Sequence, residues 1–143
     1  MIDDQEICLA ILSEAWKRSP HRGVCDHPTL EKRGENPACG DVVSFSLEQK
    51  DGRIQNLKHR GDGCAVSQAS AALLADLLQN LTVPDAMILL DNAAQFLRGE
   101  HDGGQELMNF AALRIIRGNP ARQQCAMVAV SLAISMLAAP AQN

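Results

Sequence analysis

Apolar and polar positions divide the chain into an N-terminal helix, a pair of strands and a helical second half. In residues 4–18 the apolar side chains recur every three or four positions, which predicts an amphipathic helix that stops at Ser19-Pro20. Cys8 lies in the apolar stripe of this helix and is expected in the core. Residues 20–40 are rich in Pro, Gly and charge, so they predict a loop, with a short edge strand near residues 29–32.

A β-hairpin is predicted after this loop. Apolar residues alternate with mostly polar ones over residues 42–48, as in a strand with one buried face. Asp51-Gly52 is a turn signal that sends the chain back into a second strand over residues 53–60, where Ile54 and Leu57 are the clearest apolar positions.

Helical periodicity returns in the second half of the chain. It predicts helices over residues 64–80, 84–98 and 105–117, and a last helix that begins at the capping pair Asn119-Pro120. The inner face of the last helix is expected to carry four apolar residues: Met127, Val130, Ile134 and Leu137. The segment from Pro140 is expected to fray.

These elements predict an α+β fold: a small three-stranded antiparallel sheet packed against several helices, in one domain that spans residues 1–143. A chain of this length can bury a stable core without disulfides or an obligatory metal. Any metal is therefore expected to be functional rather than structural.

Composition narrows the possible functions. The net charge of −4, the absence of Tyr and the low content of Trp and Phe argue against nucleic-acid binding, which needs a basic surface and stacking aromatic rings. The acidic N-terminus and the lack of a long apolar run predict no signal peptide and no membrane span, hence a cytoplasmic protein. In that reducing compartment, the five cysteines are expected to be ligands, nucleophiles or buried apolar groups.

A basic cluster follows the first predicted helix: Lys17, Arg18, His21 and Arg22. The simplest interpretation is a solvated helix end. The alternative is a surface that docks an acidic partner protein.

Cys39, Asp41, Cys64 and Cys125 are the candidate metal ligands. Cys64 begins a predicted helix, where free amides and the helix dipole favour a thiolate over a thiol. Arg122 lies one turn before Cys125 on the same face, so its guanidinium is positioned to support that thiolate. Three thiolates and one carboxylate suit tetrahedral zinc or an iron–sulfur cluster.

The carboxylate is the informative member of this donor set. A hard oxygen ligand binds a thiophilic centre less firmly than a thiolate, so the site suits release rather than permanent storage. The chain has no Cys-x-x-Cys pair, which is typical of structural zinc sites. From spacing alone, buried apolar cysteines would remain the better interpretation.

The sequence around the donors favours metal ligands over buried apolar cysteines. Residues 36–41 (Asn-Pro-Ala-Cys-Gly-Asp), 61–71 (Gly-Asp-Gly-Cys-Ala-Val-Ser-Gln-Ala-Ser-Ala) and 120–125 (Pro-Ala-Arg-Gln-Gln-Cys) resemble, in order and spacing, the iron–sulfur cluster assembly family of IscU, the NifU N-terminal domain and SufU. The resemblance covers roughly residues 5–138. The long insertion before the last cysteine, and Gln124 where other branches have histidine, are closest to the SufU branch.

The resemblance implies that Cys39, Asp41, Cys64 and Cys125 together hold a zinc ion or a [2Fe–2S] cluster. In the SufU branch the site resembles a zinc site whose first cysteine, here Cys39, accepts sulfur from the persulfide of a SufS-like cysteine desulfurase. Downstream iron–sulfur acceptor or scaffold proteins would then be further partners. Arg122 matches the arginine of the branch's Ala-Arg-x-x-Cys motif. A cluster scaffold and a sulfurtransferase-like acceptor both remain open.

Some positions depart from the family pattern. Its His-Tyr-x-Asn-Pro-Arg segment, which resembles a partner-docking region, is replaced by Trp-Lys-Arg-Ser-Pro-His at residues 16–21. Cys25 and His27 are extra and are interpreted as ordinary loop residues. His59 is expected to be an exposed strand residue, and His101 to lie in a polar loop.

Two other function classes compete with cluster assembly. One is a thiol enzyme that uses Cys64 alone with a histidine base, although no histidine is placed by the sequence to serve it. The other is a small interaction domain whose cysteines are simply buried.

Overall fold

The computed structural model describes residues 3–138. The two ends of the predicted domain, including the segment from Pro140 that is expected to fray, lie outside the described residues. The elements are α1 (Asp4–Lys17), β1 (Leu30–Asn36), β2 (Asp41–Lys50), β3 (Arg53–Asp62), α2 (Ala65–Leu78), α3 (Val83–Leu97), the 3-10 helix η1 (Gln105–Ile116) and α4 (Pro120–Ala138). The predicted α+β class and its three-stranded antiparallel sheet, in the order β1-β2-β3, are confirmed.

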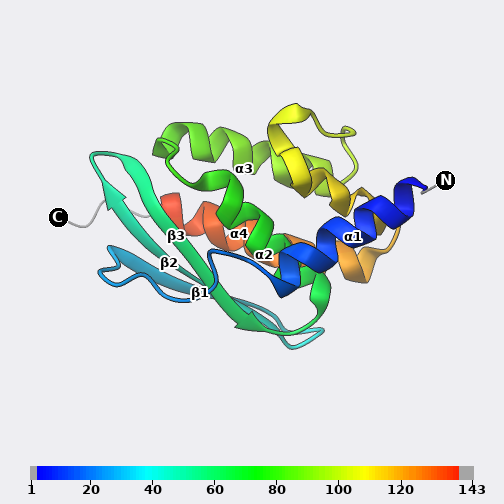
Figure 1. Cartoon of the computed structure of the whole chain (residues 1–143), viewed down its shortest axis with the longest axis horizontal. Helices are drawn as coiled ribbons and strands as arrows, with labels where there is room; N and C mark the ends of the chain where they lie inside the picture. Colours follow the sequence, from blue (N-terminus) through cyan, green and yellow to red (C-terminus); the bar gives the residue numbers. More distant parts are fainter. Residues whose placement is uncertain (1–2, 139–143) are drawn as a thin grey trace.

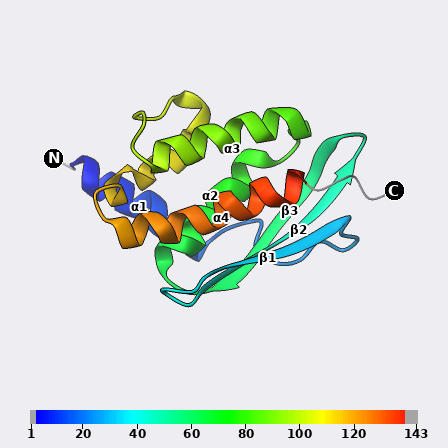
Figure 2. The same cartoon turned by 180° about the vertical axis from the view of Figure 1, so that it is seen from behind.

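The elements form layers (Figure 1). Helices α2 and α4 pack against one face of the sheet, with α2 over β3 and α4 over β1. Helix α1 packs on α2, and α3 packs on α4, while η1 contacts both α1 and α3. The view from behind shows the long α4 running between α3 and the sheet (Figure 2). The apolar core therefore lies between the sheet and α2 and α4, and it continues from there beneath the outer helices.

Side-chain caps begin the helices where the sequence predicts them to start. Asp3 accepts the Glu6 amide of α1 at 2.8 Å, and Thr82 accepts an amide in the first turn of α3 at 3.3 Å. Asn119 accepts the Arg122 amide of α4 at 3.1 Å. These bonds satisfy amides that have no partner within the helix.

A β-bulge explains the unusual spacing of apolar residues in β3. Ile54 and Leu57 are three residues apart, so a regular strand would place them on opposite faces. The register with β2 shifts between Glu48 and Gln49, which leaves one extra residue, Gln55, on β3. Both Ile54 and Leu57 consequently face the core and are buried.

The predicted α-helix over residues 105–117 is instead the 3-10 helix η1, interrupted at Met108. Four of its buried residues recur every three positions: Leu107, Phe110, Leu113 and Ile116. A 3-10 helix has three residues per turn, so this spacing keeps all four on one face. The exact period of three, rather than 3.6, was the available signal.

The prediction of an exposed His59 is wrong. Its side chain is only 1% exposed, because β3 turns it inward and the segment after α1 covers the edge of the strand. The Gly23 amide donates to the His59 carbonyl at 2.8 Å, and the His59 amide donates to the His21 carbonyl at 3.0 Å. The His59 Nε2 lies 2.7 Å from the Ser19 hydroxyl, while its buried Nδ1 has no hydrogen-bond partner among residues 3–138.

Helix α4 is long and apolar enough to cross a membrane by length and hydropathy alone. This is weak support for a span, because the core helix of a compact domain passes the same test. Here α4 contacts α2, α3, β1 and β2. Eight of its residues are buried: Cys125, Ala126, Ala129, Val130, Leu132, Ala133, Met136 and Leu137. Of the predicted inner face, Val130 and Leu137 are buried, whereas Met127 and Ile134 are only partly buried.

Candidate metal and sulfur site

The predicted donors meet at one end of the sheet. They lie in the turn that leads into β2, in the loop before α2 and near the start of α4. Cys39 lies in the turn between β1 and β2, and Asp41 is the first residue of β2. Cys64 lies between β3 and α2, and Cys125 lies in the second turn of α4. The fold thus brings distant parts of the sequence to one edge.

A tight turn places Cys39 beside Asp41. The amides of Cys39 and Gly40 both donate to the Asn36 carbonyl, at 3.2 and 2.8 Å. Gly40 has a φ of +72°, in the left-handed region that side chains other than glycine rarely occupy. This glycine therefore allows the backbone to turn between the two donors.

Asp41 links the sheet to the start of α2. It is 1% exposed, and its Oδ1 accepts the Cys64 amide at 2.8 Å. The Cys64 thiol lies 3.8 Å from the other carboxylate oxygen. A Cβ on Gly63, which has a φ of +144°, would lie 2.3 Å from Asp41 Oδ1, so only glycine leaves room for this contact.

Cys64 serves as the N-cap of α2. Its sulfur accepts the Ser67 amide at 3.5 Å, and the Ser67 hydroxyl donates to the Cys64 carbonyl at 3.0 Å. The predicted position at a helix start is therefore confirmed. The thiol nevertheless remains exposed.

Cys125 completes the cluster from the opposite side. Its sulfur lies 3.7 Å from the Cys39 sulfur and 3.8 Å from the Asn36 side-chain amide. Ligand atoms of Cys39, Asp41 and Cys125 all lie within 4.8 Å of one another. Cys64 falls outside that group, although its thiol contacts Asp41.

These distances fit a tetrahedral thiophilic metal. With zinc–sulfur bonds of about 2.3 Å and tetrahedral angles, two sulfur ligands lie about 3.8 Å apart. The observed separation of the Cys39 and Cys125 sulfurs, 3.7 Å, is close to this value. Three thiol groups and one carboxylate also match the donor preference of zinc and of iron–sulfur clusters.

Burial and hydrogen bonding set the protonation of the cluster. Burial alone would raise the pKa of Asp41, but hydrogen bonds from the Cys125 thiol and from the Cys64 amide and thiol outweigh it and lower that pKa. Burial raises the pKa of the Cys125 thiol strongly, and the neighbouring Asp41, Cys64 and Cys39 add to the shift. These shifts favour the ionised form of the Asp41 carboxyl group and the protonated form of the Cys125 thiol.

The support predicted for Cys125 from Arg122 stays a prediction. Arg122 is exposed, and among the described residues no hydrogen bond joins its side chain to the Cys125 sulfur. Cys8 is buried in the core as predicted. Cys25 is buried too, with its thiol 3.3 Å from the Ser46 carbonyl, so it is a packed group rather than an open loop residue.

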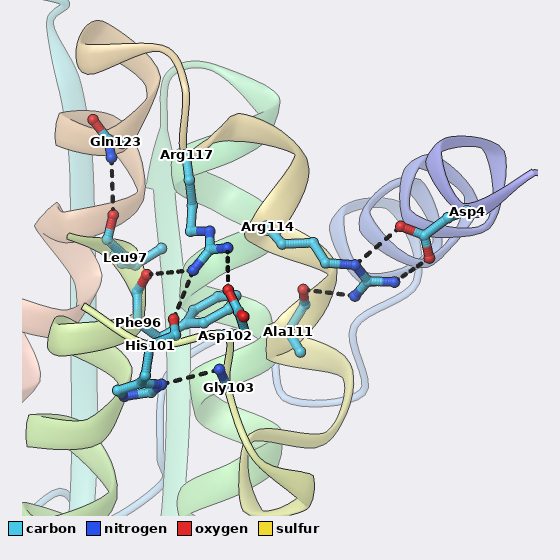
Figure 3. Close-up of polar contacts among 10 residues, drawn as sticks. All are labelled: Asp4, Phe96, Leu97, His101, Asp102, Gly103, Ala111, Arg114, Arg117 and Gln123. Atoms are coloured by element: carbon cyan, nitrogen blue, oxygen red, sulfur yellow. Dashed lines mark hydrogen bonds and ion pairs between the residues drawn. The ribbon is translucent and has the colours of Figure 1, made fainter. Parts of the chain in front are cut away.

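Polar contacts connect the end of α3 with the segment that leads to α4 and with the first turn of α4 (Figure 3). The Gln123 side chain donates to the Leu97 carbonyl at 3.0 Å. Arg117 donates to the carbonyls of Phe96 and His101, at 3.3 and 2.7 Å, and its guanidinium lies 4.8 Å from the centre of the Phe96 ring. The Gln123 contact ties the end of α3 to the first turn of α4, directly before the turn that carries Cys125.

Sequence reasoning missed three supporting residues: Asn36, Gly63 and Ser67. All lie within the segments on which the resemblance rests, but nothing in their spacing shows what they contact. Asn36 holds the turn before Cys39 and faces Cys125, Gly63 makes room for Asp41, and Ser67 is paired with Cys64. A glycine directly before a candidate ligand was the one signal available.

Comparison with known proteins agrees with this geometry. A protein from Thermotoga maritima named iron–sulfur cluster assembly scaffold protein IscU is 33% identical over 108 residues, which is 76% of either chain. A protein from Bacillus subtilis named zinc-dependent sulfurtransferase SufU is 24% identical over 81% of this chain and 79% of its own.

A similar structure and a family match complete the comparison. A crystal structure from Fervidobacterium islandicum, described as a putative iron–sulfur cluster assembly scaffold protein for the SUF system, superimposes with a TM-score of 0.84 over 89% of this chain and 93% of that one. Its identity of 22% supports the fold alone. The model of the NifU-like N-terminal domain family matches residues 12–130. The chain therefore belongs to the family of NifU-like N-terminal domains.

Proposed function

We propose that this protein works in iron–sulfur cluster assembly as an acceptor of sulfur, with a zinc ion held by Cys39, Asp41, Cys64 and Cys125. The observation that carries the proposal is the convergence of these donors at one end of the sheet, with the Cys39 and Cys125 sulfurs 3.7 Å apart and the buried Asp41 carboxylate beside them. The match to the zinc-dependent sulfurtransferase SufU, and the long α3 segment between Cys64 and Cys125, favour zinc over a stored cluster.

Cys39 is the proposed acceptor because it differs from the other two cysteines. Its side chain is exposed, whereas Cys125 is 5% exposed and has a raised pKa caused first by burial. Cys64 is exposed, but its sulfur already accepts the Ser67 amide and its thiol contacts Asp41. Cys39 is therefore the thiol that an incoming donor reaches most easily.

The transfer step balances without an added oxidant. The Cys39 thiolate attacks the outer sulfur of a persulfide on a SufS-like cysteine desulfurase. A new sulfur–sulfur bond forms at Cys39, the donor's sulfur–sulfur bond breaks, and the donor's cysteine leaves as a thiolate. Bound zinc would supply stabilisation of the thiolate form at neutral pH. Downstream assembly proteins in the cytoplasm would then receive the sulfur.

The second candidate is a scaffold on which a [2Fe–2S] cluster is built as cargo. It is favoured by the match to the scaffold protein IscU of Thermotoga maritima, which is 33% identical over 76% of this chain. In this version Asp41 is the weak ligand that allows the cluster to be released.

A persulfide assay tests the acceptor role. The protein is incubated with a SufS-type desulfurase and cysteine, and bound sulfur is located by mass spectrometry of tryptic peptides. We expect an added sulfur on Cys39, and loss of desulfurase stimulation in Cys39→Ser. Cys25→Ser is the matched control, since it removes a buried thiol outside the cluster. Equal stimulation by wild type and Cys39→Ser would contradict the proposal.

A further inference from the structure

An apolar groove lies at the far end of α2 from the metal and sulfur site. It has a volume of about 520 Å³ and is walled by α2, α3 and η1. Helix α2 has 14 residues, so about 20 Å separates Cys64 from this end of the helix. Five apolar side chains line the groove: Leu77, Leu81, Ile88, Leu89 and Met108. None of the four candidate ligands takes part.

Two of these side chains are unusually exposed for their size. Ile88 and Met108 are each 70% exposed, while the other three are partly buried. Large apolar side chains clustered on a surface mark binding sites more often than scattered single ones do.

The backbone at Met108 is strained, and the strain presents its side chain to the groove. Met108 has φ 48° and ψ −129°, a conformation that glycine adopts easily and that other residues adopt only at a cost. Because the side chain is 70% exposed, little packing against the described part of the chain offsets this cost. Such strain is typically retained where it serves recognition.

The charge around the groove indicates the partner. Asp85 and Glu106 line it, and Asn92 fixes Glu106 through a hydrogen bond of 2.6 Å. A symmetric contact between two copies of this chain would bring two acidic rims together. A partner that carries Lys or Arg beside its apolar residues would instead be complementary.

The walls of the groove also restrict the shape of the partner. They are helical, so their backbone groups are paired internally and offer no strand edge to an extended peptide. Four lining residues on α3 follow the pattern i, i+3, i+4, i+7: Asp85, Ile88, Leu89 and Asn92. We propose that this groove binds an amphipathic helix of a partner protein, two to three turns long, with apolar anchors flanked by basic residues.

Two synthetic helical peptides test this proposal. Both are 14-residue fluorescein-labelled amphipathic helices with leucine on one face, and they carry either lysine or glutamate on the other. Fluorescence anisotropy is measured with the full chain at physiological salt. We expect the leucine/lysine peptide to bind at least tenfold more tightly than the leucine/glutamate peptide.

Four variants of the chain separate the groove from general electrostatic attraction. Ile88→Ser and Met108→Gly should each weaken binding of the lysine peptide at least fivefold, while Leu9→Ser, on exposed α1, should not. Met108→Gly should also raise the melting temperature, which shows that lost binding does not come from unfolding. The double variant Asp85→Lys, Glu106→Lys should prefer the glutamate peptide.

Three results would overturn the proposal. They are equal binding of the two peptides, unchanged binding by the groove variants, and self-association in sedimentation that Ile88→Ser abolishes. The last result would identify the groove as a contact between copies of the chain.

Discussion

At the scale of single residues, the site depends on hydrogen bonds and close contacts among its residues as well as on their ability to bind a metal. Asp41 is buried and accepts the Cys64 amide, and Gly63 leaves the space in which this happens. Asn36 and Ser67 hold the two cysteine loops through short hydrogen bonds. Substitutions at these positions can therefore distinguish effects on the folding of the site from effects on metal binding.

Gly63→Ala should disrupt the site although it changes no ligand. The added Cβ would lie 2.3 Å from Asp41 Oδ1, and the φ of +144° is unfavourable for alanine. We expect a loss of roughly 1–3 kcal/mol in the free energy of unfolding and reduced metal content. Chemical denaturation and metal analysis provide the measurements. Gly118→Ala is the matched control, because its Cβ would meet no atom within 4 Å, and it should behave as wild type.

Asp41→Ala should lose both metal and stability, and Asp41→Asn should lose metal alone. Alanine leaves the Cys64 amide without its acceptor, which costs about 1–3 kcal/mol for a buried donor. Asparagine can still accept that hydrogen bond but lacks the negative charge of the carboxylate. Metal content and thermal melting of both variants provide the test. Full metal content in Asp41→Ala would show that the carboxylate is no ligand.

At the scale of elements, two sets of contacts stabilise the packing of helices and strands. One set lies around the end of α3, and the other lies in the segment after α1. Gln123 joins the start of α4 to the end of α3, and Arg117, at the end of η1, contacts Phe96 of α3 and His101 in the loop after it, as Figure 3 shows. The residues from His21 to Gly23 bind along the free edge of β3 through backbone hydrogen bonds. Each set of contacts gives a separate prediction about the stability of the protein.

Arg117→Ala should lower the free energy of unfolding by roughly 2–3 kcal/mol. It removes hydrogen bonds to two carbonyls and a cation–π contact with Phe96. Urea denaturation measures the change. Arg98→Ala, which removes an exposed ion pair with Glu100, should cost less than about 1 kcal/mol. Equal effects of the two variants would argue against this stabilising role of Arg117.

His59 should make the protein less stable in mild acid. Burial lowers its pKa to about 4, and the positive charges of Arg22 and His21 add to the shift. The unfolded chain takes up a proton near its ordinary pKa of about 6.5, but the folded protein does not until about pH 4. Stability is therefore lost as pH falls between these values, by roughly 2 kcal/mol from pH 7 to pH 5.

The control for this effect is a second histidine. His59→Gln should remove much of the pH dependence measured by urea denaturation, whereas His27→Gln, at an exposed loop position, should leave it unchanged. If both variants kept the wild-type slope, the acid sensitivity would arise elsewhere in the chain.

The sequence predicts most helices and strands, but it does not predict their local irregularities. The hairpin, the capped helices and the turn at Gly40 follow from local patterns, because the side chains that determine them are near neighbours. The bulge at Gln55 and the burial of His59 depend on strands and loops far apart in the chain. No local pattern contains that information.

At the scale of the whole molecule, the fold gathers distant cysteines at a surface end of the sheet. The residues that flank the four candidate ligands were sufficient to predict them, since each ligand lies in a distinctive segment. The structure adds which of them touch: Cys39 with Cys125, and Asp41 with Cys64.

The central claim is that these four residues form one thiophilic metal site. Metal and acid-labile sulfide content of protein purified without oxygen, with an absorption spectrum, tests it most directly. We predict about one zinc per chain, little sulfide and no visible band, and loss of zinc in Cys125→Ser but not in Cys25→Ser. Iron with matching sulfide and a visible band would favour the scaffold over the zinc-held acceptor. Protein that contains neither metal would contradict both.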